Sequence, residues 1–496
     1  MLLPLKHTSK AVLLAAVSLA LPIKNMAQSN QKKPNLLIIH TDEQSFRSLS
    51  CYENSWKEAR TPHIDKLADN GVRFENFYAN HPVCTPSRSA LLTGRYAQEV
   101  QSYFNDIPLA DEAITLGHIF KQNGYITGYV GKWHLDGHDK PGFGPRRNFG
   151  FEDNRYMFNR GHWKQITEAN GQPQVKTYKD IGDEESYTTD FLANKTIEFI
   201  KQHKGQKWCH MLSIPDPHGP DVDRQPYNSM YNEADVSVPE SFSLLETDKP
   251  RWASRQKGKN DPEARLRHTK ARYLGMVKHI DDCVGEIMQA LKKSGQLENT
   301  VVVFTSDHGD MMGEFGRYNK GIPLDASAKV AHIIHYPSKI NKGMVINEVV
   351  SNVDFIPTLI DLMGIDYADE ALCGESVVPL LSESRSDVQW GNTAFISVGK
   401  LVAVVTPHYK LVYSEVDVPW LYDREKDPDE VKNYFNDAAY GPVIKELTVK
   451  LKNYLVSTHD PNWTGGLGEL YRRRTGKVKN NVEFSSLKEY VERYAR

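Results

Sequence analysis

The sequence predicts an α/β protein built around a mostly parallel central sheet. Short, unbroken apolar runs alternate with helix-like segments between residues 34 and 305. Such runs are typical of strands buried on both faces, and their alternation with helices favours a parallel sheet. Two of the runs end directly in polar clusters, as strands do at the ligand-binding edge of such a sheet. A chain of 496 residues, 40% of them hydrophobic, is long enough to bury a large core.

The predicted elements follow one another along the first part of the chain. The first strand covers residues 34–40 and closes at Thr41-Asp42-Glu43-Gln44. Thr61-Pro62 pairs a helix N-cap with a proline at the first helical position, and it opens a helix that stops near Asn70-Gly71. Apolar periodicity predicts further strands at 72–78, 126–130, 208–214 and 300–305, and helices at 115–122, 186–203 and 263–294, the last as one or two helices.

The pattern changes after Leu381. Short strands at 393–398, 402–405 and 409–413, followed by residues 420–428, predict a small antiparallel sheet, and a helix near 442–455 is expected to pack on it. We therefore expect a catalytic domain at 28–385 and a C-terminal subdomain with its tail at 386–496. The basic tail is interpreted as solvated rather than as contacting a substrate; its charged residues are Arg472, Arg473, Arg474, Lys477 and Lys479.

Residues 1–27 have the pattern of a secretory signal peptide, with Lys6 and Lys10 ahead of an apolar run at 11–21. The run is shorter than the roughly 20 residues that cross a bilayer, so a membrane anchor is disfavoured. We therefore expect an exported protein, periplasmic or secreted, without a membrane span. A net charge of −2 supplies no broad field for nucleic acid, so anion binding must be local. No pattern indicates the oligomeric state.

One cysteine stands at a fixed spacing from a proline and an arginine. Residues 81–94 read HPVCTPSRSALLTG, which contains CxPxR followed by LLTG. This run resembles the signature of type I sulfatases, members of the alkaline phosphatase superfamily, whose cysteine is oxidised to formylglycine. Residues 124–135, GYITGYVGKWHL, resemble the second signature of that family. Further matches at 353–359 and 374–381 extend the resemblance, which implies a large alkaline-phosphatase-like catalytic domain with a smaller C-terminal domain.

The resemblance implies how the first signature works. Cys84 becomes formylglycine through a maturation enzyme, and one hydroxyl of the hydrated aldehyde attacks sulfur while the other later expels free sulfate. Arg88 positions the modified side chain. Conversion of Cys84 also resolves the odd cysteine count, because it leaves Cys51, Cys209, Cys283 and Cys373, whose pairing the sequence does not predict.

The resemblance also implies an anion pocket. Lys132 is expected to bind sulfate, and His134 is expected to contact the formylglycine hydroxyl and to act as the base that removes its proton. On an extended segment, these two side chains point to the same side. His218, in IPDPHGP, matches a shorter family segment and is expected to bind sulfate and to protonate the leaving oxygen. Lys320, in RYNKG, matches the second sulfate-binding lysine.

The implied metal site consists of Asp42, Glu43, Asp307 and His308, completed by an oxygen of the modified Cys84. Carboxylate-rich ligation suits a hard cation, and the family usually holds Ca2+. This sequence departs from the family at two positions: Glu43 stands where many members have Asp, and His308 where many have Asn. A nitrogen ligand leaves Mg2+, Mn2+ and Zn2+ as alternatives.

The loop after the second signature is the expected substrate subsite, although a plain surface loop is an equal alternative. Its candidates are Asp136, His138, Arg146 and Arg155, with Arg147, Arg160 and His162 nearby. The predicted function is hydrolysis of a sulfate monoester on a sulfated carbohydrate. The alternatives are a phosphonate monoester or phosphodiester hydrolase of the same superfamily, and a glycan-binding protein without catalysis.

Overall fold

The computed structural model describes residues 33–254, 263–368, 371–382, 388–468, 470, 472 and 485–495. The described residues from Lys33 onward form one compact unit, so the boundary expected near residue 385 stays a prediction. The signal peptide expected at 1–27, and four of the five basic tail residues, lie outside the described part. Within that part, no helix has the length and apolar character needed to cross a membrane. All five cysteines are described, and none forms a disulfide.

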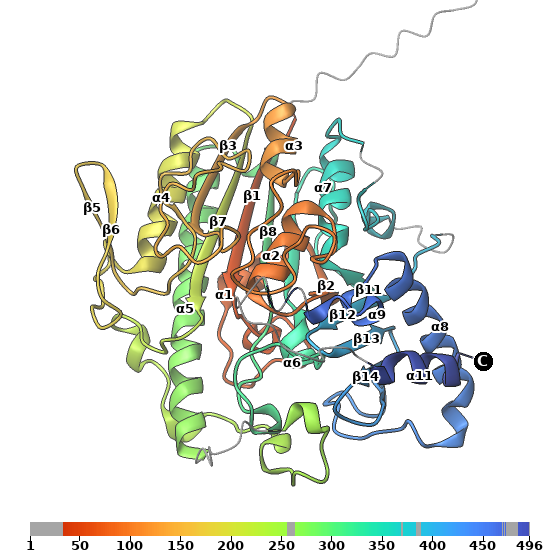
Figure 1. Ribbon diagram of the computed structural model, residues 1–496. Helices are drawn as coiled ribbons and strands as arrows, with labels where there is room; N and C mark the ends of the chain where they lie inside the picture. The colour runs from red at the N-terminus through yellow and green to blue at the C-terminus, as the bar shows by residue number, and fades with distance from the viewer. Residues whose placement is uncertain are drawn as a thin grey trace, which may run out of the picture. The chain divides into compact units, whose positions relative to one another are not determined.

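A mostly parallel sheet organises the molecule (Figure 1). Its strand order is β11 (Met344–Ser351), β2 (Val72–Tyr78), β10 (His332–His335), β8 (Thr300–Ser306), β1 (Asn35–Asp42), β7 (Trp208–Pro217), β3 (Ile126–Lys132) and β4 (Met157–Phe158). Strand β10 runs antiparallel to both neighbours, as does β9 (Lys329–Val330) to β2, while the other pairs are parallel. The predicted fold class is therefore confirmed.

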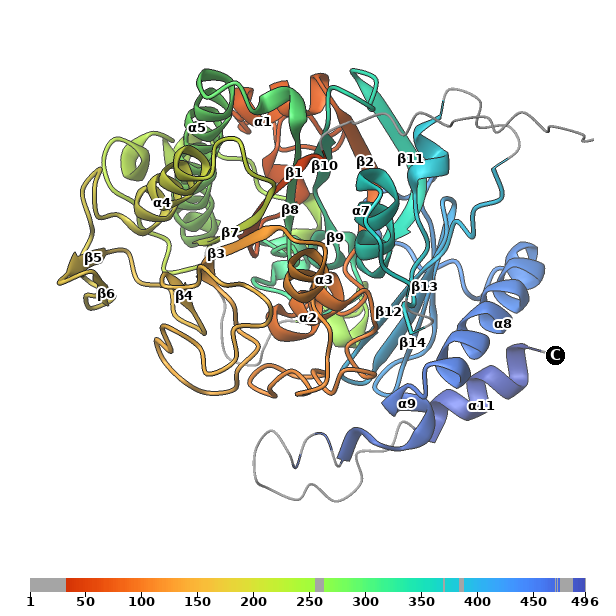
Figure 2. The ribbon, with the colours of Figure 1, turned by 90° about the horizontal axis from the view of Figure 1, so that it is seen from above.

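Side chains of the central strand β1 alternate between two helical layers. Leu36 and Ile38 belong to the core beneath α2 (Cys84–Thr93), α3 (Leu116–Gln122) and α7 (Phe355–Met363). Leu37 and Ile39 belong to the core beneath α1 (Pro62–Asp69), α4 (Thr188–Gln202) and α5 (Glu263–Lys293). Figure 2 shows these two sets of helices on opposite faces of the sheet. Burial on both faces explains why the strand is apolar without interruption.

The predicted antiparallel sheet is present at the C-terminal end of the chain. Its strands pair in chain order as β12 (Ala394–Val398), β13 (Leu401–Val405), β14 (Tyr409–Ser414) and β15 (Trp420–Asp423). Helices α8 (Gly441–Ser457) and α11 (Ser485–Tyr494) pack on this sheet. The interpretation of the tail as solvated is wrong for α11, because Leu487 and Val491 are buried. Leu487 and Val491 are four residues apart, so they lie on one face of the helix. This apolar spacing follows the basic residues on which the prediction of a solvated tail was based.

Several short elements carry no clear periodicity in the sequence. They are β4, β5 (Ile166–Ala169), β6 (Gln172–Val175), β9, β10, α6 (Asp325–Ala328) and α9 (Pro461–Thr464). The long predicted helix at 263–294 is a single helix, α5. Most predicted boundaries agree with the structure within a few residues, but β7 continues to Pro217 and therefore extends to the edge where the polar side chains gather.

His279 on α5 is buried between two carboxylates. Its Nε2 lies 2.9 Å from Oδ2 of Asp190, and its Nδ1 lies 2.9 Å from Oδ1 of Asp223. Burial alone would lower the pKa of His279, but hydrogen bonding to these carboxylates raises the pKa to about 12. Because an unfolded histidine has a pKa of about 6.5, this interaction stabilises the fold fully below that pH and progressively less above it.

We expect His279→Gln to lower the free energy of unfolding by about 3 kcal/mol near pH 6, because it leaves the buried carboxylate of Asp223 without its cation, whereas Asp190 retains Arg224. The difference from the wild type should shrink at about pH 9, since the wild-type interaction weakens as pH rises. Urea unfolding at both pH values measures this. His408→Gln, at an exposed histidine paired with Glu425, is the control. A difference that grows with pH would contradict the assignment.

Candidate active site

The predicted site residues gather at the carboxyl edge of the main sheet. Asp42 ends β1, Lys132 ends β3, and Asp307 and His218 directly follow β8 and β7. Thr41 is in register with Ser306, so Asp42 and Asp307 leave adjacent strands side by side. The strand ends therefore bring together residues that are more than 250 positions apart in the sequence, as expected for an open α/β sheet.

Cys84 is the first residue of α2. Pro86 fits within this helix because it lies in the first turn, where a backbone N–H has no partner within the helix. The backbone N–H of Thr85 instead donates to Oδ1 of Asn105 at 3.0 Å. The helix therefore directs the positive end of its dipole at Cys84.

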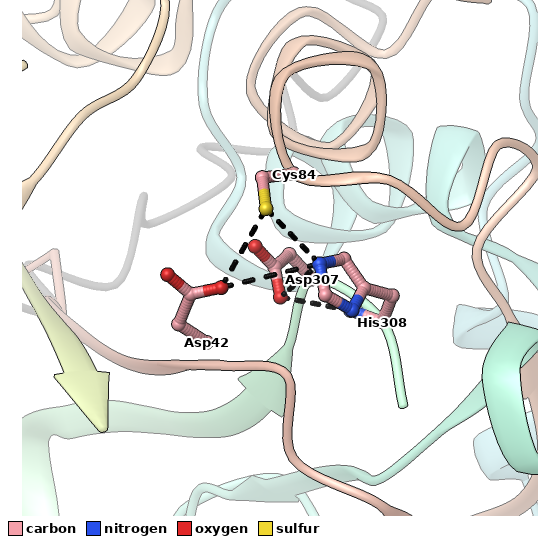
Figure 3. A group of neighbouring side chains, drawn as sticks. All are labelled: Asp42, Cys84, Asp307 and His308. Atoms are coloured by element: carbon pink, nitrogen blue, oxygen red, sulfur yellow. Dashed lines mark hydrogen bonds and ion pairs between the residues drawn. The ribbon is translucent and has the colours of Figure 1, made fainter. Parts of the chain in front are cut away.

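Four side chains converge into a buried cluster: Asp42, Cys84, Asp307 and His308, whose ligand atoms all lie within 4.8 Å of one another. Figure 3 shows them pointing toward a common centre. Sγ of Cys84 lies 3.2 Å from Nε2 of His308 and 3.8 Å from Oδ1 of Asp42. The predicted ligands other than Glu43 thus lie together.

The cluster suits a divalent cation. Asp42 and Asp307 are both buried, and burial together with the charge of Asp42 raises the pKa of Asp307. Nδ1 of His308 lies 3.0 Å from the carbonyl oxygen of Gly309, a contact in which Nδ1 donates and Nε2 faces the cluster. Burial opposes protonation of His308, yet Asp307 and Cys84 raise its pKa to about 9. A bound cation would replace this proton and neutralise the carboxylates.

Glu43 lies beside the cluster, and its carboxylate binds Lys320 and His218. Its backbone has a φ of 63°, and its N–H donates to Oδ1 of Asp307 at 3.0 Å. Its Oε2 accepts from Nζ of Lys320 at 2.7 Å and from Nε2 of His218 at 2.9 Å. Its Oε1 is buried and has no hydrogen-bond partner among the described residues. Lys320 and His218 therefore converge on one anionic oxygen, and the free Oε1 is the atom that a nearby cation could use.

Arg88 holds the strand ends in place. Its Nε donates to Oδ2 of Asp307 at 2.9 Å, and one terminal nitrogen donates to Oγ of Ser213 at 2.8 Å and to the carbonyl oxygen of Lys132 at 2.9 Å. Its side chain is 1% exposed. Burial alone would raise the pKa of Asp42, but Lys132 and Arg88 hold that pKa well below its usual range. Arg88 thus fixes the geometry of three strands and keeps Asp42 ionised.

The second signature departs from the expected extended geometry. Strand β3 ends at Lys132, and His134 has a φ of 58°, so the alternation that would align the two side chains stops. Nζ of Lys132 pairs with Oδ2 of Asp42, whereas Nε2 of His134 lies 3.4 Å from Oδ1 of Asp106. The hydroxyl of Thr85 donates to the carbonyl oxygen of His134 at 2.8 Å. This contact ties His134 to the turn of α2 that carries Cys84.

His162 is a member of the site that the motifs did not identify. Its Nε2 lies 3.0 Å from Nζ of Lys132 and 3.2 Å from Oδ2 of Asp42, and its ring stacks on that of His218. Burial and the charge of Lys132 lower the pKa of His162, while Glu43 raises the pKa of His218 against the effect of burial. The surroundings therefore shift the pKa values of the two stacked rings in opposite directions. The sequence placed His162 only within a polar loop, because it belongs to no motif.

The expected substrate loop divides into two parts. Near the site, Nδ1 of His138 lies 3.8 Å from Oδ2 of Asp106, and Arg160 pairs with the same carboxylate. Asp136 pairs with Arg147 at 2.9 Å. The exposed side chains of Arg146 and Arg155 line two separate surface hollows, one beside His118 and the other beside Lys195. Neither hollow is lined by a residue of the cluster, so the structure does not bring these two arginines to it.

The comparisons with known proteins agree on one family. Residues 34–365 match the family described as Sulfatase, and residues 313–457 match the family described as N-sulphoglucosamine sulphohydrolase, C-terminal. The chain is 26% identical over 516 aligned positions to the N-acetylglucosamine-6-O-sulfatase of Bacteroides thetaiotaomicron, with 88% of each chain covered.

Two solved structures share the fold. One, determined in complex with its substrate D-glucosamine-2-N,6-O-disulfate, has a TM-score of 0.73 at 23% identity and covers 86% of this chain and 99% of its own. The other is the phosphonate monoester hydrolase of Silicibacter pomeroyi, with a TM-score of 0.71 at 22% identity, covering 86% of this chain and 96% of its own. The family match extends from β1 through the cluster to α7. The chain therefore belongs to the type I sulfatases of the alkaline phosphatase superfamily and is a sulfuric ester hydrolase.

Proposed function

We propose that this sulfatase removes sulfate from a sulfated carbohydrate, with formylglycine derived from Cys84 as nucleophile and Ca2+ as its metal. The observation that carries the proposal is the buried cluster of Asp42, Cys84, Asp307 and His308. The cluster pairs the cysteine of the modification signature with an oxygen-rich ligand set. Ca2+ accepts such a set with flexible geometry, and Glu43 would add a further oxygen.

The residues around the cluster supply the remaining functions. When present, the metal stabilises charge on the reacting oxygens, and the formylglycine provides the attacking hydroxyl. Lys132 and Lys320 hold the anion, and Lys320 already contacts a carboxylate oxygen. His218 carries the proton for the leaving oxygen, consistent with its raised pKa. His134 accepts a proton, and its Nδ1 is buried without a hydrogen-bond partner among the described residues.

The burial of the signature supports maturation before folding. Cys84 is 2% exposed, and Pro86 and Arg88 are also buried. A formylglycine-generating enzyme that reads this motif therefore needs the chain before α2 packs against the sheet. Maturation during export fits the signal-peptide pattern of residues 1–27. We accordingly propose that the mature enzyme is periplasmic or secreted.

The carbohydrate assignment is supported by the named relatives and by polar groups near the site. One relative is a sulfatase of N-acetylglucosamine, and one structural neighbour binds a disulfated glucosamine. Asp106 and Arg160 are partly exposed, and Asp106 contacts His134. Charged and planar side chains of this kind suit the hydroxyl groups and charges of a sugar. The phosphonate hydrolase shares the fold alone, so its chemistry is the alternative that an assay must test.

A sulfate-release assay over sulfated monosaccharides and oligosaccharides tests this proposal, with an aryl sulfate and an aryl phosphonate for comparison. We expect release from at least one sugar sulfate and a higher kcat/KM for the aryl sulfate than for the phosphonate. Arg160→Ala should raise the KM for the preferred sugar about tenfold and change that for the aryl sulfate little, because a lost charged hydrogen bond amounts to about 1.5 kcal/mol. Arg155→Ala, at an exposed arginine outside the site, is the matched control.

Two results would count against the proposal. A marked preference for the phosphonate would replace the proposed activity. Equal effects of Arg160→Ala on both sulfate substrates would remove Arg160 from the sugar subsite.

A further inference from the structure

The reaction outlined above uses His218 but gives no role to His162, whose ring stacks on that of His218. The ring centroids are 3.8 Å apart and the planes differ by 3°. The two side chains are 20% and 21% exposed, so both are largely enclosed. They come from different parts of the fold, since His162 lies in the loop between β4 and β5 and His218 follows β7.

A buried ion pair joins the two backbone segments that carry these rings. Lys164, two residues after His162, donates from Nζ to Oδ1 of Asp216 at 2.5 Å, and both side chains are buried. Asp216 lies two residues before His218. Its other oxygen accepts from the hydroxyls of Tyr187 at 2.8 Å and Thr189 at 2.9 Å, so the carboxylate is fixed on both sides. A satisfied buried pair of this kind fixes relative position.

The loop that carries His162 is also held from its other side. Trp163 is buried in the core beneath α4 and α5, and its carbonyl oxygen accepts from the hydroxyl of Thr188 at 2.7 Å. Gly161 has a φ of 137°, and a Cβ there would lie 2.0 Å from the ring of Trp163. The chain can therefore turn tightly between Arg160 and Trp163 only with glycine at this position.

We propose that His162 is a positioning residue that fixes the imidazole plane of His218 for proton transfer to the leaving oxygen. The inference rests on the proposed function of His218 as the proton donor. His162 covers one face of the His218 ring. Nε2 of that ring faces Oε2 of Glu43, the oxygen that Nζ of Lys320 also contacts. Without the stacking ring, His218 would be held only at its two nitrogens, by the contact of Nδ1 with the carbonyl oxygen of Gly219 at 3.0 Å and by that of Nε2 with Glu43, and its plane could tilt about the line between these contacts.

This role makes a distinctive kinetic prediction. Proton donation matters most when the leaving oxygen is a strongly basic sugar alkoxide and least when it is a weakly basic nitrophenolate. His162→Gln removes the ring, so kcat/KM for a sugar sulfate should fall about 100-fold, with a loss of about tenfold or less for 4-nitrophenyl sulfate. His162→Phe retains a flat ring and should lower both values by similar factors.

The double variant with His218→Gln completes the test. If His162 acts through His218, the double variant should show the same ratio between the two substrates' losses of kcat/KM as His218→Gln alone. His203→Gln, at a histidine on the far end of α4, is the control for a general loss of stability. Thermal unfolding of every variant reports folding, and His162→Asn replaces His162→Gln if the latter does not fold.

The outcomes separate the inference from the function on which it rests. Equal losses on both substrates in His162→Gln, or the same leaving-group dependence in His162→Phe, would overturn the positioning role. A wild-type enzyme that releases no sulfate from either substrate would instead overturn the proposed function.

Discussion

Replacing Cys84 with alanine is expected to lower sulfate release by about 10⁴-fold or more, because alanine cannot be converted to formylglycine, the proposed source of the attacking oxygen. The thiol is enclosed by Asp42, Asp307 and His308 and lies at the positive end of α2. Burial would raise the pKa of Cys84, but Lys132 and Lys320 bring it well below the usual range. The position is thus built for a negatively charged atom, which alanine cannot provide. Steady-state rates with an aryl sulfate and a sugar sulfate measure the loss.

Two controls isolate the chemistry at Cys84 from effects on the fold. Cys51→Ala alters a partly buried cysteine outside the cluster and should leave the rates unchanged. Wild-type protein made in a host without a formylglycine-generating system should be as inactive as Cys84→Ala, although its sequence is intact. Full activity in Cys84→Ala would show that another group is the nucleophile.

Removal of the metal should have the second-largest effect. Dialysis against a chelator, or the variant Asp307→Asn, is expected to lower kcat/KM about 10³-fold, because a bound cation supplies several kcal/mol of charge stabilisation. A second measurement does not depend on turnover. Metal that binds only the folded protein raises its stability by about 2.7 kcal/mol at a free concentration 100 times its Kd. Thermal unfolding with added Ca2+, Mg2+, Mn2+ or Zn2+ therefore ranks the metals.

Asp307→Asn should abolish this metal-dependent stabilisation. Glu425→Gln, which alters an exposed carboxylate paired with His408, should retain it. The same ranking of metals reports on His308, because a nitrogen ligand favours Zn2+ or Mn2+ more than an oxygen ligand would. A metal-free enzyme with full activity and no stabilisation by any of the four ions would contradict the assigned site.

The sequence predicted the parts of the site that follow directly from strands. Asp42 and Asp307 stand at the ends of unbroken apolar runs, so their meeting at one sheet edge required only parallel pairing. Glu43 was less predictable, because its backbone has a positive φ and its side chain contacts His218 and Lys320. No periodicity signals a single left-handed residue.

The loop residues were the least predictable part. His162 reaches the site because a buried ion pair between Lys164 and Asp216 joins two distant segments, and no local pattern encodes such a contact. Arg146 and Arg155 illustrate the reverse case. Their composition suited an anion subsite, yet both are exposed and line other hollows. The composition of a loop does not determine where its side chains point, because tertiary packing sets the backbone path.

Mass spectrometry of the Cys84 peptide from active, metal-loaded enzyme tests the central claim most directly. The account predicts formylglycine at residue 84 and a specific activity that rises in proportion to the converted fraction. Active enzyme in which residue 84 is entirely an unmodified thiol would contradict it.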